Sequence, residues 1–221
     1  ARVLIPKGTY PVTALFLKSD MILELQENAV LAGIYDRART PILPGQIEYD
    51  NEDGYYNLGS WEGNPIDSFA SMITGIHVKN VTICGKGVLD GRADFENWWS
   101  RPKDKIRAWR PRMIFLNHCK NITVVGVTVQ NSPAWNLHPY FSNQIRFLDM
   151  EVKGPANSHN TDGCDPESCT NVEIAGVHFS VGDDCIAIKS GKIYMGKKFK
   201  VPSKHIHIRQ SWMQDGHGAV T

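Results

Sequence analysis

Three short, glycine-flanked segments carry the side chains of this sequence that are best suited to chemistry. They are Asn-Thr-Asp-Gly at residues 160–163, Gly-Asp-Asp at residues 182–184 and Gly-His-Gly at residues 216–218. Asp162 and Asp183 begin a regular spacing along the chain, and His217 continues it after a somewhat longer interval. Acid/base cleavage of a sugar linkage needs one carboxyl group that donates a proton and another that activates water. The segments therefore indicate chemistry on a carbohydrate.

Short β-rich runs recur along the sequence and predict the elements that position these segments. Val81, Ile122, Ile145, Val172 and Ile206 are taken as equivalent positions of successive runs. Their spacing fits a base period of roughly 22 to 25 residues, lengthened by insertions, which is typical of stacked β-coils. The first runs are residues 21–25, 81–83, 122–125, 145–148, 172–174 and 206–208, and second runs follow at 127–129, 177–179 and 186–188.

This repeat predicts an all-β fold, a right-handed parallel β-helix. A β-sandwich also has many short strands, but its strands usually alternate apolar and polar residues and are joined by tight hairpins. Here the turns are irregular, and helical periodicity is nearly absent. We expect a single β-helix domain over residues 1–221, interrupted by loop excursions at about 33–72 and 92–112.

In such a fold, equivalent positions of successive coils stack at about 4.8 Å. The step from Asp162 to Asp183 is close to one coil, and the step from Asp184 to His217 is one coil plus an insertion around residues 192–202. The geometry predicts that Asp162, Asp183, Asp184 and His217 form a patch on one face. Asn, Asp and Gly favour turns in any protein, which would explain any one segment alone. Three segments in order at coil spacing favour a site.

The composition limits the classes of protein to which this chain can belong. The 221 residues are 42% hydrophobic and 21% charged, as is ordinary for a globular domain. A net charge of +1 gives no global signature of nucleic-acid binding, and no run of 18 apolar residues predicts a transmembrane helix. We expect neither a nucleic acid nor a membrane as partner. The five cysteines predict mostly buried thiols, with a single disulfide left open.

The three segments, taken with their neighbours, resemble glycoside hydrolase family 28, the polygalacturonases. They match, in order, three of the four signatures of that family. Residues 109–112 (Trp-Arg-Pro-Arg), 131–135 (Asn-Ser-Pro-Ala-Trp) with His138, and 187–191 (Ala-Ile-Lys-Ser-Gly) are similar to bacterial members, particularly the exo-acting type. The resemblance extends from about Val3 to Thr221 and implies a single-stranded, pectin-lyase-like β-helix.

One signature of that family is absent from the sequence. It is an Arg-Ile-Lys tripeptide that binds substrate carboxylate, and the resemblance places it about one coil beyond Thr221. The usual opening segment is also missing, and the first residues already read as a strand and a turn. We therefore expect an internal portion of such a β-helix, truncated at both ends. The sequence leaves the cellular compartment and the oligomeric state open.

The resemblance also assigns roles to the residues of the three segments. Asp183 is the general acid, and Asp162 and Asp184 hold and deprotonate a water molecule, which gives inversion at the anomeric carbon. His217 tunes the protonation of the acid. Three carboxyl groups packed together cannot all ionise easily, so the pKa of one should rise, which supplies the acid with its proton near the working pH.

The implied substrate, a pectic polysaccharide or oligogalacturonide, is a polyanion, and basic residues are concentrated near the segments. Residues 186–213 contain no Asp or Glu but carry Lys189, Lys192, Lys197, Lys198, Lys200, Lys204 and Arg209. Residues 101–112 form a second basic segment, with six basic residues against Asp104. Such cations can border a cleft and bind galacturonate carboxylates.

Individual substrate-binding residues follow from position and from the resemblance. Lys189 is the first candidate, because it follows the aspartate pair closely on the same coil. The resemblance adds His159 and Asn160 as cleft residues and His138 from the preceding coil. Four tryptophans either stack on sugar rings or pack in the protein: Trp98, Trp99, Trp109 and Trp135.

Other functions are compatible with the same pattern. A related hydrolase would act on rhamnogalacturonan or xylogalacturonan, although Thr161 favours plain galacturonan because relatives that cleave rhamnogalacturonan tend to differ there. A pectate lyase shares the β-helix but requires calcium and a basic proton abstractor. A non-catalytic, carbohydrate-binding β-helix is a further alternative. Exo or endo action depends on whether loops close one end of the cleft; the two excursions are candidates, and the resemblance leans towards exo.

No cofactor is expected and no metal site is assigned. Glycosidic hydrolysis by carboxyl groups needs neither. His205 and His207 alternate along one predicted strand and so point to the same face. Two histidines without a carboxylate or a third ligand make an incomplete metal site.

Overall fold

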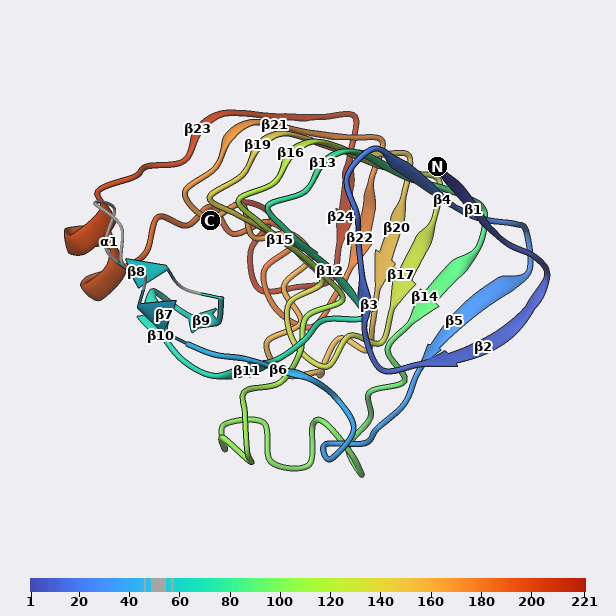
Figure 1. Cartoon of the computed structure of the whole chain (residues 1–221), viewed down its shortest axis with the longest axis horizontal. Helices are drawn as coiled ribbons and strands as arrows, with labels where there is room; N and C mark the ends of the chain where they lie inside the picture. Colours follow the sequence, from blue (N-terminus) through green and yellow to red (C-terminus); the bar gives the residue numbers. More distant parts are fainter. Residues whose placement is uncertain (46, 49–54, 57) are drawn as a thin grey trace.

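The computed structural model describes residues 1–45, 47–48, 55–56 and 58–221. Three parallel sheets run along the molecule (Figure 1). The first sheet contains β1 (Arg2–Ile5), β4 (Met21–Leu25), β13 (Lys79–Gly85), β16 (Lys120–Val125), β19 (Asn143–Leu148), β21 (Thr170–Ala175) and β23 (Lys204–Arg209). The second contains β2 (Gly8–Val12), β5 (Ala29–Gly33), β14 (Val88–Asp90), β17 (Thr128–Gln130), β20 (Glu151–Lys153), β22 (His178–Ser180) and β24 (Trp212–Gln214). The third contains β3 (Leu15–Phe16), β12 (Ile73–Ile76), β15 (Ile114–Asn117) and β18 (Leu137–Tyr140).

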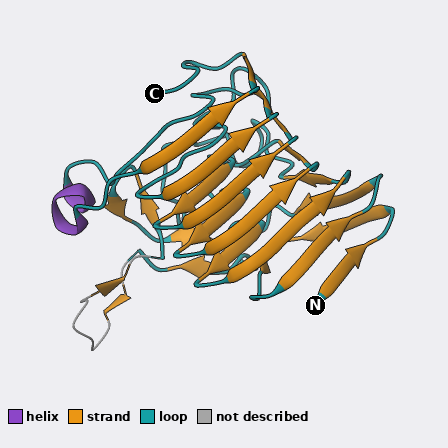
Figure 2. Cartoon of the chain, turned by 90° about the horizontal axis from the view of Figure 1, so that it is seen from above, coloured by secondary structure: helices purple, strands orange, loops and turns teal. Residues whose placement is uncertain are grey.

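Each coil of the chain visits the first, second and third sheets in that order. Strands of one sheet lie side by side and point the same way, and the two termini lie at opposite ends of the stack (Figure 2). Consecutive coils therefore pair in parallel, as in β16 with β19 and β19 with β21. The predicted all-β, parallel β-helix is confirmed.

The register of the first sheet agrees with the spacing of the sequence repeat. Val81 pairs with Ile122, Ile122 with Ile145, Ile145 with Val172, and Val172 with Ile206. The predicted steps between these residues are thus the lengths of the successive coils. The register holds because a slip by one residue would turn the buried side chains outwards.

Stacked apolar side chains form the core that keeps the coils in register. Ile83, Val124, Phe147 and Ile174 are paired in sequence along the first sheet, and each is fully buried. Successive side chains of a strand alternate between the two faces, so these positions point inwards while their neighbours face solvent. Full burial of one such side chain stabilises the fold by roughly 1.5 to 3 kcal/mol.

One of the three predicted second runs differs from the other two. Residues 127–129 and 177–179 do coincide with β17 and β22, but residues 186–188 form no regular strand. Ile186 instead makes isolated parallel bridges to Cys164 and Val220, along the line of the third sheet. The physical reason is that β22 already occupies the second-sheet position of this coil. A turn at residues 181–185 then carries the chain to the third sheet.

Both predicted excursions leave the coils between the second and third sheets (Figure 1). The first separates β5 from β12 and contains β6 (Ile42–Leu43), β7 (Ile47–Glu48), β8 (Tyr55–Tyr56), β9 (Ser60–Trp61), β10 (Asn64–Pro65) and β11 (Ser68–Phe69). These strands form three two-stranded antiparallel pairs. Residues 92–112, all of them described, contain no named strand. Part of the first excursion lies outside the described residues.

Among the described residues, one short helix, α1 (Tyr194–Phe199), was not predicted and occupies the expected insertion between the third and first sheets. Its buried residue Met195 packs in a cluster with Phe115 and Tyr140. The Met195 N–H donates to the C=O of Gly63 at 3.1 Å, which joins the helix to the first excursion. No helix among the described residues is long and apolar enough to cross a bilayer.

The cysteines confirm the predicted buried thiols. All five are free, four are buried, and Cys84 is half-buried. Burial raises the pKa of Cys119 and Cys185 to about 11 and that of Cys169 to about 12. Such thiols remain protonated and pack as small apolar groups.

Candidate active site

The three glycine-flanked segments lie at the same corner of successive coils. Residues 160–163 connect β20 to the bridge at Cys164, and residues 182–184 connect β22 to the bridge at Ile186. Residues 216–218 connect β24 to the bridge at Val220. Each segment thus lies where the chain passes from the second to the third sheet. The corner is also the place from which both excursions leave the coils.

Backbone hydrogen bonds tie the three segments together. The Gly163 N–H donates to the C=O of Asp184 at 2.9 Å, and the His217 N–H donates to the C=O of Asp183 at 3.2 Å. The Cys185 N–H donates to the C=O of Gly218 at 2.8 Å. Backbone bonds of this kind continue the parallel pairing of the sheets through the turns. They set the spacing of the side chains that the turns carry.

The predicted patch of acidic side chains is present. One oxygen from each of Asp162, Asp183 and Asp184 lies within 4.8 Å of the other two. The Asp162 side chain is 6% exposed and the Asp183 side chain 22% exposed, so the cluster opens towards Asp183. His217 Nδ1 lies 3.3 Å from Asp183 Oδ1, and its ring is largely exposed. The structure therefore brings together all four residues that we expected to be catalytic.

Two glycines allow the turns to approach this closely. A Cβ on Gly163 would lie 2.4 Å from the Cys185 carbonyl oxygen and 2.4 Å from the Phe179 ring. A Cβ on Gly182 would lie 2.4 Å from the Ser158 carbonyl oxygen. All three distances are below the 3.0 Å that real Cβ contacts essentially never reach, so a larger residue would push the turns apart. Glycine is required here by close approach rather than by backbone angles.

Thr161 supports the turn from within and does not face the pocket. Its side chain is buried, and Oγ1 accepts a hydrogen bond from the Gly182 N–H at 3.1 Å. The same oxygen lies 2.6 Å from the Ser158 hydroxyl. Thr161 was expected to mark the substrate class, but its side chain does not face the pocket and so offers no direct contact to support that expectation. Its hydroxyl instead connects the Asp162 turn to the turn that carries the aspartate pair.

This contact gives a stability prediction. Thr161→Val keeps the side-chain shape but leaves the buried Gly182 N–H without an acceptor, which is expected to cost about 1 to 3 kcal/mol. Urea unfolding followed by circular dichroism measures the difference. Thr161→Ser retains the hydroxyl and serves as the control. If the valine and serine variants unfolded at the same urea concentration, the hydroxyl would not be the group that joins the turns.

Burial dominates the electrostatics of the acidic cluster. It raises the pKa of the Asp162 carboxyl to about 6; the Lys189 ammonium opposes the rise, and the Asp183 carboxylate adds to it. Burial also raises the pKa of Asp165 well above its ordinary value, and the neighbouring Asp162 carboxylate adds to that effect. Sequence reasoning missed Asp165, although its position shortly after Asp162 was a visible signal.

A pocket of about 410 Å³ opens above the cluster. Its lining residues are Glu62, Gly63, Trp135, Asn160, Asp162, Glu167, Asp183, Asp184, Ile188, Lys189, Ser190, Gly191 and Lys192. The residues from the first excursion and those from the insertion before α1 form one wall. Within that wall, Lys192 Nζ lies 2.7 Å from Glu62 Oε2.

The predicted substrate-binding residues have different placements. Lys189 and Asn160 line the pocket. His159 is exposed and packs edge-on against Phe95, with ring centroids 6.1 Å apart, outside the pocket lining. His138 is fully buried, with Nε2 2.9 Å from Glu167 Oε2. The structure thus does not bring His138 to the pocket surface, because the third-sheet strand that carries it turns the ring inwards.

Two buried arginines from the end of the second excursion support the site; the sequence indicated them as part of a basic segment and of the family resemblance, without a role at the site. Arg110 donates to the Asn160 side-chain oxygen at 2.7 Å and to the His159 C=O at 2.8 Å. Arg112 donates to the Ser60 C=O. Burial lowers the pKa of each arginine to about 10, so both remain charged at neutral pH. Arg110 orients the segment that carries Asp162.

The tryptophans mostly pack within the protein. Trp98 and Trp99 are buried in a cluster with Phe69. Trp135 stacks on Trp61 with ring centroids 4.4 Å apart and contributes to the pocket lining. Of the four predicted candidates, Trp135 is therefore the one whose ring is placed at the site.

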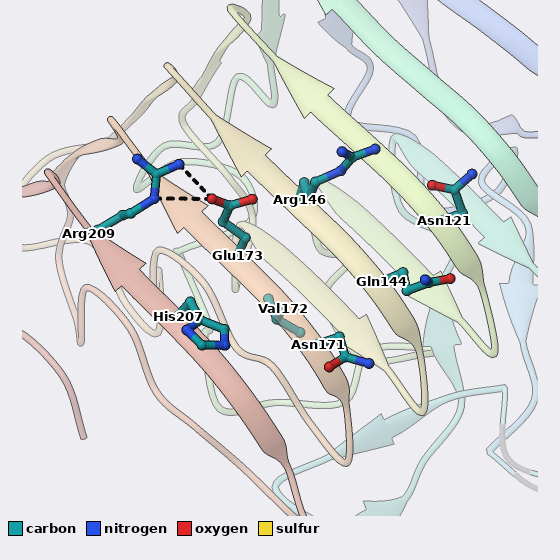
Figure 3. Close-up of a pocket in the computed structure, with 8 residues that line it drawn as sticks. All are labelled: Asn121, Gln144, Arg146, Asn171, Val172, Glu173, His207 and Arg209. Atoms are coloured by element: carbon teal, nitrogen blue, oxygen red, sulfur yellow. Dashed lines mark hydrogen bonds and ion pairs between the residues drawn. The ribbon is translucent and has the colours of Figure 1, made fainter.

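A larger hollow, of about 520 Å³, lies on the outer face of the first sheet, away from the acidic cluster (Figure 3). Arg146, Glu173, His207 and Arg209 contribute to it. The guanidinium of Arg209 is paired with Glu173 at 2.7 Å, so part of its positive charge is neutralised. His205 is not among the lining residues. This hollow is larger than the pocket at the acidic cluster, but its lining residues include one carboxyl side chain, Glu173, and therefore no pair of carboxyl groups suited to acid/base chemistry.

The acidic cluster is also close enough to share a cation. Three carboxylate oxygens within 4.8 Å are a spacing that a metal ion can use. Here the Lys189 ammonium, 3.7 Å from Asp162 Oδ2, already supplies positive charge at the cluster. We therefore assign no metal to these residues.

Comparisons with known proteins agree with this geometry. The model of the family described as Glycosyl hydrolases family 28 matches residues 48–220. A probable polygalacturonase from Vitis vinifera is 32% identical over 222 residues, covering 100% of this chain and 43% of that protein. An endo-polygalacturonase from Pectobacterium carotovorum subsp. carotovorum is 32% identical over 182 residues, covering 77% of this chain and 42% of that protein.

The fold is also shared with solved structures. An exopolygalacturonase from Thermotoga maritima superimposes with a TM-score of 0.82 at 26% identity, covering 99% of this chain and 54% of that chain. The chain thus spans about half the length or less of the relatives that it matches. The predicted resemblance is confirmed by the family match across most of the sequence, together with the acidic turns that its signatures form. This chain belongs to glycosyl hydrolase family 28.

Proposed function

We propose that the protein hydrolyses α-1,4-galacturonosyl linkages of polygalacturonan or pectin by an inverting acid/base reaction. The observation that carries this proposal is the cluster of Asp162, Asp183 and Asp184 in a pocket that also presents Lys189 and Lys192. Carboxyl groups supply both the proton and the activation of water. Positive charge at the pocket suits a substrate that carries one carboxylate on each sugar.

The roles follow from exposure and position together with the family resemblance. Asp183 is reachable from the pocket and donates its proton to the glycosidic oxygen, which leaves with that proton. Asp162 and Asp184 hold a water molecule that attacks the anomeric carbon and gives its proton to a carboxylate. His217, 3.3 Å from Asp183, influences the protonation of the acid. Because two carboxylates share the water, the separation rule for a single acid/base pair does not decide the stereochemistry.

We further propose that cleavage is exo-acting. The wall formed by Glu62, Gly63 and Lys192 stands at one side of the pocket and is closed by an ion pair of 2.7 Å. The second excursion contributes Arg110 behind Asn160 rather than a lining residue. A product profile on polygalacturonate checks this proposal. One small product from the earliest times is expected, and a mixture of oligomers from the outset would overturn it.

The hydrolytic proposal gives a direct mutational prediction. Asp183→Asn removes the proton donor and is expected to lower kcat by roughly 10² to 10⁴-fold. Release of reducing ends from polygalacturonate measures the loss. Asp104→Asn, at an exposed carboxylate that pairs with Arg101, is the control and should retain activity. If the folded wild-type protein released no reducing ends, the protein would not be a polygalacturonan hydrolase.

The same assay separates the alternatives. A pectate lyase would form an unsaturated product that absorbs in the ultraviolet and would lose activity in EDTA, and neither result is expected. Rhamnogalacturonan and xylogalacturonan, supplied in place of polygalacturonate, test the related hydrolases. Binding of polygalacturonate without cleavage by the wild-type protein would indicate a carbohydrate-binding β-helix instead.

A further inference from the structure

A fully buried carboxyl group lies directly behind the acidic cluster and has no role in the mechanism above. Asp165 is inaccessible to solvent. Lys189 Nζ lies 3.2 Å from Asp165 Oδ1 and 3.7 Å from Asp162 Oδ2. Among the described residues, no backbone N–H, hydroxyl or amide group hydrogen-bonds to either oxygen of Asp165. The ammonium of Lys189 is therefore the cation that lies against this carboxyl, whose pKa burial raises well above its ordinary value.

Aromatic packing fixes Lys189 on its other side. Its Nζ lies 4.7 Å from the centroid of Trp135, which stacks in turn on Trp61. A cation is attracted to the face of an aromatic ring. The Lys189 side chain is only 24% exposed. The ammonium thus has three defined neighbours, and it differs from a mobile surface lysine that reaches out to a substrate.

Several charged groups face Asp162 from different loops. They are Asp165 on its own segment, Asp183 and Asp184 on the next turn, Lys189 on the coil that follows that turn, and Arg110 on the second excursion. Arg110 is engaged with two backbone carbonyl groups and the side chain of Asn160. In the part of the chain that the structure describes, Lys189 is the cation that pairs with the Asp162 carboxylate, at 3.7 Å.

We propose that Asp165 is a positioning residue that holds the Lys189 ammonium against Asp162, so that Asp162 stays ionised and can accept the proton of the attacking water. This inference rests on the proposed function. It changes the role expected of Lys189 from a contact of the substrate carboxylate to an internal counter-charge. Without that charge, a buried carboxylate beside Asp183 and Asp184 would bind a proton, and a protonated Asp162 cannot accept one from water.

Lys189→Met tests the counter-charge, because methionine is similar in length and carries no charge. The acid limb of the kcat/KM profile on polygalacturonate is expected to move upwards by roughly one to three pH units. KM at the new optimum should change by less than about threefold, because no substrate contact is lost. A rise in KM of about tenfold or more with an unmoved acid limb would show that Lys189 binds substrate, and would overturn the proposal.

Asp165→Asn tests the positioning role, because it keeps the side-chain shape and replaces one carboxyl oxygen by an amide NH₂ group, which cannot accept a hydrogen bond from the Lys189 ammonium. The acid limb is expected to move in the same direction by a smaller amount, with a lower kcat. The double variant Asp165→Asn/Lys189→Met should be no worse than Lys189→Met alone, since Asp165 acts through Lys189. Losses that simply add would contradict this. Lys153→Met, at an exposed lysine paired with Glu151, is the matched control and should leave the pH profile unchanged.

A titration without substrate separates this inference from failure of the proposed function. Carbon NMR of the aspartate carboxyl groups, with the Asp162 signal assigned from Asp162→Asn, follows ionisation directly. The apparent pKa of Asp162 is expected at about 6 in the wild-type protein and higher in Lys189→Met. An unchanged titration overturns the inference even in an inactive protein. A shifted titration in a folded protein without activity supports the Lys189 pairing and counts only against the hydrolase assignment.

A conservative variant keeps the test decisive if Lys189→Met fails to fold. Lys189→Arg retains the positive charge and is expected to keep the wild-type titration of Asp162. Circular dichroism and thermal unfolding check that the variant folds. If Lys189→Arg folded and yet shifted the Asp162 titration as far as Asp165→Asn does, charge at this position would not be what sets the ionisation of Asp162.

Discussion

Asp162→Asn is expected to stabilise the fold above pH 6 and to abolish hydrolysis. Burial raises the pKa of Asp162 to about 6 from an ordinary value of 3.8, so the folded protein binds the proton more tightly than the unfolded chain does. This contribution to stability is fully present below pH 3.8 and is lost as the pH rises through 6. Above pH 6 the ionised, buried carboxyl costs about 3 kcal/mol, which the neutral amide of Asn removes.

Urea unfolding between pH 3.5 and 8 measures this difference. The free energy of unfolding of Asp162→Asn, relative to the wild type, is expected to grow between pH 4 and 6 and then to stay constant. Asp104→Asn, at an exposed ion pair, is the control and should change the free energy by less than about 1 kcal/mol at any pH. A destabilised Asp162→Asn at pH 7 would mean that the attraction to Lys189 outweighs the cost of burial.

The same substitution tests whether Asp162 lowers the stability of the fold but is needed for hydrolysis. Under the proposed mechanism, Asn at position 162 cannot accept a proton from water, so kcat should fall by roughly 10² to 10⁴-fold. A variant that is both more stable and inactive is typical of an active-site residue. If Asp162→Asn retained full activity, Asp184 alone would be sufficient to activate the water.

Gly163→Ala is expected to damage both the fold and the site. The new methyl group would lie 2.4 Å from the Cys185 carbonyl oxygen and 2.4 Å from the Phe179 ring, and neither can yield without moving the coil. Overpacking of this kind costs about 1 to 3 kcal/mol. The turn that carries Asp162 would move away from Asp184, and a misplacement of about 1 Å can lower the rate by roughly 10²-fold.

Urea unfolding and reducing-end release measure the two effects of Gly163→Ala. Gly154→Ala is the matched control, because a Cβ there would meet only the Ser158 hydroxyl at an ordinary 3.7 Å. That variant should change the free energy of unfolding little, or raise it slightly by restricting the unfolded chain. Equal behaviour of the two alanine variants would show that the turns have more freedom than the close contacts indicate.

Much of the scaffold could be predicted because it depends on local repetition. The spacing of Val81, Ile122, Ile145 and Val172 predicts their pairing, since one buried position per coil must lie above the next. The corner that carries the aspartates follows from the same spacing. Residues 186–188 were predicted as a second run in the same way as 127–129, because an apolar run by itself does not say which face of the coil it occupies.

The supports of the site could not be predicted in the same way. Arg110 and the wall at Glu62 act through contacts between segments that are far apart in sequence and follow no period. His138 was expected at the surface, but the direction of its strand places the ring in the interior. Burial, which decides the ionisation of Asp162, is a property of all these neighbours together and has no signature in any one motif.

The sequence by itself determined the coil repeat, the family and the three turns that carry Asp162, Asp183, Asp184 and His217, because period and turn chemistry are local properties of the chain. Only the tertiary structure decided the ionisation of Asp162. Burial raises the pKa of Asp162, and Lys189 Nζ lies close to the carboxyl groups of both Asp162 and Asp165. The strength of a charge interaction depends on distance and on exclusion of water, and both are set only when the coils have stacked.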